Sequence, residues 1–442
     1  MLRLGCAKVD VIPDFPVFLH GYGARNRRAD GIESPVEVGV LALEQDGRRV
    51  LLVTADMIGV FMDTARKIYA ALEAKFGIAY PDIWLSCSHS HFCPALAGFG
   101  VTAAGGLELG WYPQSQEHYY EFWMERLERC VEQALGSLRE VTLEQVTIPV
   151  SGIAFNRRPV NKATGLVETN YTWPRGKADK YDFQRIDETL AVWRFLADGK
   201  PVAILGRYSC HPVTGGQNHY AFSGDYPGFF KAAVQRLFGC PGFFLLGTAG
   251  DVVPMRRNGD SREDLGETLA RAIRLNDLRF MPAPEFKLET QVITVKSHIR
   301  RLDNYDRSQR EALWQKALSE ASRDPKGPYN TALAKELYRY GISARYPDTN
   351  DPEIPVQLLR LGGTVIVGLP FEVLSQIGLK LSRACPDAVV ASITGGYEGY
   401  LPLADDFPKG GYEASDGSDF NPGTGDALLQ AAIAAVNKFQ GR

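Results

Sequence analysis

The stretch Trp84-Leu85-Ser86-Cys87-Ser88-His89-Ser90-His91-Phe92-Cys93-Pro94 decides how the rest of the chain is interpreted. It belongs to an apolar run that begins at Ile83 and is typical of a buried strand, and Pro94 ends the regular structure. His89 and His91 stand two residues apart where this strand ends. Because alternate residues of a strand face the same side, both imidazoles can point to one place. Neutral imidazole is a common metal ligand, so the pair predicts half of a metal site, although two solvent-facing loop histidines would show the same spacing.

The composition is that of an ordinary globular protein, and it does not suggest a membrane or nucleic-acid-binding protein. Of the 442 residues, 45% are hydrophobic and 23% are charged, and the formal net charge is −3. We expect no basic surface for nucleic acid, and no apolar run reaches the ~18 residues that membrane insertion needs. The seven cysteines are irregularly spaced and the first residues lack the apolar core of a signal peptide. These features favour a cytoplasmic location.

The periodicity of apolar residues predicts an α/β fold with mixed β-sheets flanked by helices. Helices are expected at 61–76, 116–138, 228–238, 262–274 and 424–438. Short buried strands alternate with these helices, and residues 286–299 alternate like a strand. The charged segment 304–341 is helical by pattern and is expected to be an inserted subdomain or lid. No internal repeat is evident, and no linker divides the chain.

Five polar residues follow predicted strands at or just beyond their ends. They are Asp56, His89, His211, Asp251 and Glu372. Because ligands bind at the carboxyl ends of strands in open α/β sheets, the five are expected to share a cleft. Taken singly, most of them would also suit a purely structural role. Asp56 and Asp251 would suit helix capping or a turn, Glu372 the first turn of a helix, and His211 a hydrogen-bonded place in the core.

Seven short motifs occur in order along nearly the whole chain. They are Gly5-Cys6-Ala7-Lys8-Val9-Asp10-Val11-Ile12-Pro13, Ser88-His89-Ser90-His91, Asn156-Arg157, Cys210-His211-Pro212, Gly250-Asp251-Val252-Val253-Pro254, Pro370-Phe371-Glu372 and Gly399-Tyr400-Leu401-Pro402. Each motif is weak alone, but the ordered set is specific. With these motifs the chain resembles the catalytic domain of the neutral/alkaline, non-lysosomal ceramidases, which are zinc amidases. The resemblance implies the fold of that domain, as a single zinc-hydrolase catalytic domain over residues 1–442.

The resemblance also assigns roles to individual residues. It implies that the zinc ligands are His89, His211, Glu372 and Tyr400. His91 becomes the catalytic or substrate-polarising neighbour, and Arg157 a residue that binds the substrate or stabilises an oxyanion. Spacing alone would make both His89 and His91 ligands and would not select Tyr400. Nitrogen and oxygen donors suit Zn²⁺.

The implied reaction is hydrolysis of an amide bond by water that zinc activates. His91, with Asp251, would handle the proton, and the metal with His91 or Arg157 would stabilise the oxyanion. The chain departs from the family at Val253, where ceramidases carry a serine implicated in their catalysis. It is also expected to lack their C-terminal β-sandwich domain and secretion signal.

These departures predict a small-molecule substrate that is smaller and more polar than ceramide. Loop residues expected to line its pocket are Tyr22, Arg25, Trp111, Tyr112, Tyr397 and Tyr412, although ordinary loop packing would account for each of them equally well. Two further functions remain open. The same metal site could hydrolyse an ester, a lactone or a glycoside, or the chain could be a non-catalytic carbohydrate- or lipid-binding protein. Retention of four ligand positions favours the enzyme.

Overall fold

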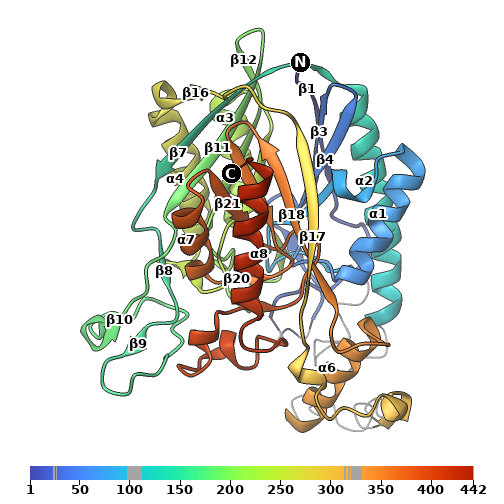
Figure 1. The fold of residues 1–442 in the computed structure, drawn as a ribbon, viewed down its shortest axis with the longest axis vertical. Coiled ribbons are helices and arrows are strands. Elements are labelled where there is room, and N and C mark those ends of the chain that lie inside the picture. Colours follow the sequence, from blue (N-terminus) through green and yellow to red (C-terminus); the bar gives the residue numbers. More distant parts are fainter. Residues whose placement is uncertain are drawn as a thin grey trace.

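The computed structural model describes residues 1–22, 25, 27–96, 112–312, 315–316, 319 and 331–441 (Figure 1). These residues form mixed β-sheets with helices packed around them, so the predicted α/β class is confirmed. Among them, no helix is long and apolar enough to cross a membrane. The sheets matter for function because the loops that leave their parallel strands meet in one place.

The first sheet has the strand order β5-β4-β3-β1-β6. Its strands are β1 (Arg3–Asp10), β3 (Glu37–Gln45), β4 (Arg48–Ala55), β5 (Ile83–Cys87) and β6 (Arg139–Glu140). Strands β1, β3 and β4 run antiparallel to one another. Helix α1 (Met62–Phe76) then crosses over, so that β5 pairs parallel with β4. Helix α2 (Tyr112–Gly136) follows and is tied to α1 by Lys75, which pairs with Glu128 and Glu132.

The second sheet repeats this connectivity, with the order β14-β12-β11-β7-β16. Its strands are β7 (Thr142–Pro149), β11 (Thr189–Ala197), β12 (Lys200–Tyr208), β14 (Gly242–Leu246) and β16 (Met281–Pro282). The first three are antiparallel, and β14 is parallel to β12. Helix α3 (Asp225–Phe238) connects the parallel pair, and α4 (Ser261–Leu275) comes after β14 and packs on α3.

The third sheet has the order β17-β18-β19-β21. Its strands are β17 (Glu289–Lys296), β18 (Glu353–Leu361), β19 (Thr364–Gly368) and β21 (Ala388–Ala391). Again three antiparallel strands are followed by a helix, α7 (Ser375–Ala384), and by a strand parallel to the third. The last helix, α8 (Thr424–Phe439), packs on α7. One unit of four strands and two helices therefore occurs three times in the described chain, a repeat that the sequence does not reveal.

The fourth strands of the three units meet where they end. Cys87 at the end of β5 donates its backbone N–H to Ile393 just beyond β21, at 3.0 Å. Ser392 donates to the carbonyl of Leu246 at the end of β14, at 2.8 Å. Two short ladders form in the loops around this meeting point. They are β8 (Ala154–Asn156) with β15 (Val252–Pro254), and β20 (Glu372–Val373) with β22 (Tyr400–Leu401).

The predicted helices agree with the observed ones in existence, and most differ by one to four residues at their ends. Of segment 304–341, the described part contains a 3₁₀ turn (Arg307–Gln309) and α6 (Thr331–Arg345). Tyr338 and Arg345 tie α6 to the body, by a 2.8 Å hydrogen bond to Asp419 and a 2.9 Å ion pair with Glu398. A role for this segment as a lid, and the single-domain organisation, stay predictions.

Asp56, which was expected in the cleft, instead joins the first two units through a buried ion pair. Its Oδ2 lies 2.6 Å from Nζ of Lys231 on α3 and accepts the backbone N–H of Glu37 at 2.9 Å. Lys231 also pairs with the Glu37 carboxylate at 3.1 Å. Burial alone would lower the pKa of Lys231, but the two carboxylates raise it above its usual range. The lysine therefore stays charged. The expectation that Asp56 lies in the cleft was wrong, because its carboxylate pairs with Lys231 instead.

Replacing Asp56 by alanine is expected to lower the free energy of unfolding by about 3 kcal/mol, because Lys231 would remain buried with only one partner. Urea denaturation followed by circular dichroism measures the change. Glu285→Ala, which removes an exposed loop carboxylate, is the matched control and should shift stability by less than about 0.5 kcal/mol. Equal effects of the two substitutions would contradict the assigned role of the ion pair.

Candidate functional site

His89 stands in the loop after β5 in a strained backbone conformation. Its φ of +64° lies in the left-handed region, which non-glycine residues rarely occupy. Its backbone N–H donates to the carbonyl of Met57 at 2.9 Å, and its ring Nδ1 lies at hydrogen-bonding distance from the carbonyl of Ile58. The Nδ1–H donated to this carbonyl leaves the lone pair on Nε2, an atom that is buried without a hydrogen-bond partner.

His211 follows β12 and is held in the same way. Its backbone N–H donates to the carbonyl of Val252 at 2.9 Å, and its Nδ1 lies 3.1 Å from the carbonyl of Ala249. Its Nε2 lies 3.2 Å from Nε2 of His91. A backbone carbonyl on Nδ1 fixes the tautomer and aims Nε2, which is the usual support of metal-bound histidines.

The ligand atoms of His89, His91 and His211 all lie within 4.8 Å of one another, and all three residues are buried. Burial lowers the pKa of His91 and of His211 well below the ordinary value, and the charge of His89 lowers both further. Neutral imidazoles are the form that binds a metal. The low pKa values keep His91 and His211 neutral, and the spacing of the three rings suits a metal ion.

Glu372 faces the histidines from the third unit. Its Oε2 is buried without a hydrogen-bond partner and lies 3.2 Å from Nε2 of His89 and 3.5 Å from Nε2 of His211. Its other oxygen accepts a hydrogen bond from the Tyr397 hydroxyl at 2.6 Å. Burial alone would raise the pKa of Glu372, but the charge of His89 and the Tyr397 hydroxyl hold it below its usual range. Imidazole nitrogens and a carboxylate oxygen that converge in one buried place are atoms that can bind a cation.

Tyr400 stands beside Glu372 because the two are register partners in the parallel β20–β22 ladder. Its hydroxyl accepts a 2.9 Å hydrogen bond from Nη2 of Arg157, which follows β8. Nε of Arg157 donates to Glu413 at 2.6 Å, and Arg158 donates to the other Glu413 oxygen at 2.9 Å. Glu413 is fully buried and fixes Arg157 toward Tyr400. Glu413 was not among the residues expected from the sequence, since nothing local marks it as the partner of two buried arginines.

Asp251 lies next to this site but its carboxylate is used elsewhere. It accepts hydrogen bonds from Asn156 Nδ2 at 2.7 Å and from the backbone N and Oγ of Ser375 at 2.7 and 2.9 Å. Both of its oxygens thus hold β8 and the first turn of α7 in place. Of the five residues expected to share a cleft, His89, His211 and Glu372 come together, whereas Asp56 and Asp251 hold the surrounding backbone.

The residues expected to line a substrate pocket fall into different places. The ring of Tyr22 lies 4.9 Å from the ring of His91, so Tyr22 borders the site. Arg25 donates to the backbone carbonyls of His20, His91 and His219, and burial lowers its pKa to about 10. It therefore holds loops together instead of facing a ligand. Trp111 and the side chain of Tyr112 lie outside the described residues.

Two tyrosines expected in the pocket contact the candidate ligands directly. Tyr397, half-buried beside His89 at 6.0 Å between ring centres, supports Glu372. Tyr412 packs edge-on against Tyr400 at 5.4 Å. Val253, in β15, is fully buried and packs with Phe155 and Val213. Neither of these two neighbours of Val253 offers a polar group to a serine hydroxyl.

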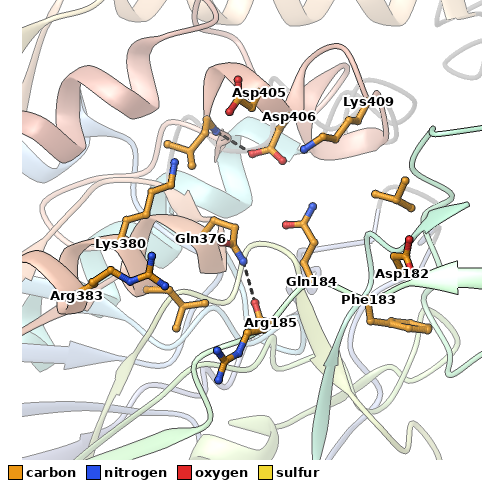
Figure 2. A pocket seen from close by; sticks show the side chains of 13 residues that line it. Asp182, Phe183, Gln184, Arg185, Gln376, Lys380, Arg383, Asp405, Asp406 and Lys409 are labelled. Carbon is orange, nitrogen blue, oxygen red and sulfur yellow. Dashed lines mark hydrogen bonds between the residues drawn. The ribbon is translucent and has the colours of Figure 1, made fainter. Parts of the chain in front are cut away.

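A separate cavity of about 780 Å³ lies beyond the first turn of α7 (Figure 2). Charged side chains of both signs line it, among them Arg185, Lys380 and Asp405. Its lining includes neither the three histidines nor Glu372. The cavity is therefore distinct from the histidine cluster.

Known proteins of one family resemble this chain in sequence and in fold. The family model described as neutral/alkaline non-lysosomal ceramidase, N-terminal, matches residues 2–236. The structure is similar to that of neutral ceramidase from Pseudomonas aeruginosa, with a TM-score of 0.74 and 18% identity, covering 99% of this chain and 74% of that one. It is also similar to a ceramidase complexed with C2, with a TM-score of 0.75 and 17% identity, covering 99% and 75%. No curated protein sequence matches. Because the family model covers more than half of the chain, the chain belongs to the neutral/alkaline non-lysosomal ceramidase family.

Proposed function

We propose that the protein is a zinc-dependent hydrolase that cleaves an amide bond. The observation that carries this proposal is the convergence of imidazole nitrogens and a carboxylate oxygen from all three units. His89 and His211 are aimed by backbone carbonyls, and Oε2 of Glu372 faces both of them. Membership of a ceramidase family supports a hydrolase, and two nitrogen donors with oxygen donors suit Zn²⁺.

His89, His211, Glu372 and Tyr400 would hold the zinc, and His91 would be free for catalysis. The hydrogen bonds at Nδ1 of the three imidazoles favour these separate roles for the ligands and for His91. Nδ1 of His91 has no hydrogen-bond partner, whereas Nδ1 of His89 and of His211 each meets a carbonyl. Room for the His91 ring comes from Gly21, where a Cβ atom would lie 2.3 Å from Nδ1. Because Nδ1 of His91 has no partner, this nitrogen is available to take up and release a proton.

When bound, zinc supplies a Lewis acid and makes water nucleophilic near neutral pH. The remaining work falls to the residues around it. His91 accepts a proton from the attacking water and delivers it to the leaving nitrogen. Arg157, held rigid by Glu413, places its guanidinium where negative charge develops on the carbonyl oxygen. Asp251 acts as a positioning residue through Asn156 and Ser375 and not as the proton acceptor.

The metal site predicts one zinc ion per chain. His211→Ala should remove the zinc and abolish hydrolysis, since the ring is lost between two other ligands. Inductively coupled plasma mass spectrometry measures the zinc content. In addition, a chelator should lower the melting temperature of the wild type but not of the variant. His298→Ala is the matched control, because His298 contacts Asp351 and Asp303 at 2.7 and 2.8 Å and is not part of the histidine cluster. A wild-type protein without zinc that keeps its activity in chelator would refute the proposal.

Replacing His91 by alanine tests whether this residue transfers protons or binds the metal. We expect kcat to fall about 10²- to 10⁴-fold while the zinc content stays at the wild-type level, because the residue moves protons and does not hold the metal. Steady-state kinetics with metal analysis of the same preparation checks this. Loss of zinc from the variant would instead make His89 and His91 joint ligands.

The buried valine predicts that the reaction proceeds without a serine nucleophile. Val253→Ser should not raise kcat and should cost about 1–3 kcal/mol of stability, because its apolar neighbours offer the new hydroxyl no hydrogen bond. Val253→Ala, which removes volume without adding a hydroxyl, is the control. A serine variant that is more active and shows a burst of product would argue for a covalent acyl-enzyme.

A further inference from the structure

Arg257 connects the two sides of the candidate site. Its Nε donates to the carbonyl of Val213, two residues beyond His211, at 2.8 Å. Its Nη2 lies 3.3 Å from the hydroxyl of Tyr22, whose ring borders His91. Its Nη1 donates to the carbonyl of Tyr171 at 2.9 Å. The guanidinium is therefore held in a fixed orientation beside the histidine cluster.

The surroundings of Arg257 place it at the solvent-facing rim of the site. Tyr171 is 48% exposed, and its ring lies 5.5 Å from the guanidinium carbon of Arg157. Arg257 itself is half-buried. Successive contacts thus connect buried Arg157 to Tyr171, Tyr171 to Arg257, Arg257 to Tyr22, and Tyr22 to His91. The three bonds of Arg257 to described residues leave one N–H on each Nη atom for a ligand.

The charge at this rim is not balanced. Arg157 and Arg158 share the carboxylate of Glu413. Neither Arg257 nor Arg25 forms an ion pair with any carboxylate in the described part of the chain. An excess of positive charge beside a site that would also hold a divalent cation favours a negatively charged ligand.

We propose that the substrate carries a carboxylate close to the scissile amide, as an N-acyl amino acid does, and that Arg257 binds this carboxylate. The inference rests on the proposed amide hydrolysis. A guanidinium fork matches a carboxylate and gives charge-assisted hydrogen bonds, whereas a neutral N-acyl amino alcohol offers no such partner. In the reaction, water adds its oxygen to the carbonyl carbon and the carbon–nitrogen bond breaks. One proton passes to the amine, so that a fatty or short-chain acid and a free amino acid leave.

The experiment compares N-octanoyl-alanine with N-octanoyl-alaninamide and N-octanoylethanolamine on the zinc-loaded full chain. The acyl group and the scissile bond are the same, and only the first compound is an anion. We expect kcat/KM to favour the anion about 10- to 100-fold in the wild type, mainly through KM, and the preference to shrink as salt rises. Arg257→Gln should reduce this preference to about 1- to 3-fold, and Arg257→Lys should restore part of it.

Arg256→Gln is the matched control, because the neighbouring arginine is 60% exposed and pairs with Asp264 at 3.1 Å. It should keep the wild-type preference. If the Arg257 variants do not fold, competitive inhibition of the wild type by alanine against alaninamide tests the same contact without a substitution. Only the carboxylate should inhibit.

The outcomes separate this inference from the proposed function. Equal turnover of the anion and the two neutral amides, with zinc present, would overturn the inference and leave amide hydrolysis standing. A preference for the anion that survives Arg257→Gln would overturn the role of Arg257. Zinc binding without turnover of any of the three amides would overturn both.

Discussion

The candidate site depends on one kind of contact, a backbone carbonyl that accepts a hydrogen bond from imidazole Nδ1. His89 in the loop after β5 meets the carbonyl of Ile58, which lies in the loop after β4. His211 after β12 meets the carbonyl of Ala249, which lies in the loop after β14. In each case the two loops leave neighbouring parallel strands of one sheet. The parallel pair therefore supplies both a ligand and the group that aims it.

The third unit uses its parallel pair differently. Glu372 follows β19 and Tyr400 follows β21, and the two residues become register partners in a short ladder of their own. Tyr397, from the same loop as Tyr400, holds one oxygen of Glu372. The loops after the third and fourth strands thus cooperate in every unit. An antiparallel pair could not do this, because its strands end at opposite edges of the sheet.

Local patterns predicted much of this fold but not the long-range pairing of charges. Amphipathic periodicity found α1, α3, α4 and α8, because burial of one helix face leaves its mark over a few turns. The spacing of His89 and His91 led to the correct expectation that their imidazoles lie together, but both residues stand in the loop after β5, so strand alternation is not the cause. Asp56 and Lys231 lie 175 positions apart, and Arg157 and Glu413 lie 256 apart, so no local signal connects them. A carboxylate residue after a strand has the same local sequence pattern whether it binds a metal, pairs with a lysine or caps a helix.

The threefold repeat of the fold could not be predicted from the sequence, for a related reason. Backbone pairing demands only apolar strands of suitable length, which unrelated side chains satisfy equally well. The side chains at matching places have different tasks: Asp56, His211 and Glu372 all follow the third strand of a unit, yet the first pairs with a lysine and the others face the cluster. Tyr400 was found only through the family resemblance. Glycine and loop composition around it gave no chemical hint.

Because each unit contributes at least one of the residues that face the cluster, the order of folding is constrained. No fragment made of one or two units contains the whole donor set. A metal held by these residues could therefore not nucleate the fold as it does in a zinc finger, where a short peptide contains every ligand. Such an ion would find all of its ligands only after the three sheets have docked, when the loop-closure entropy between distant segments has already been lost. Tight metal binding would then stabilise the assembled chain mainly by lowering the rate at which the units separate, and it would raise the rate of their association less.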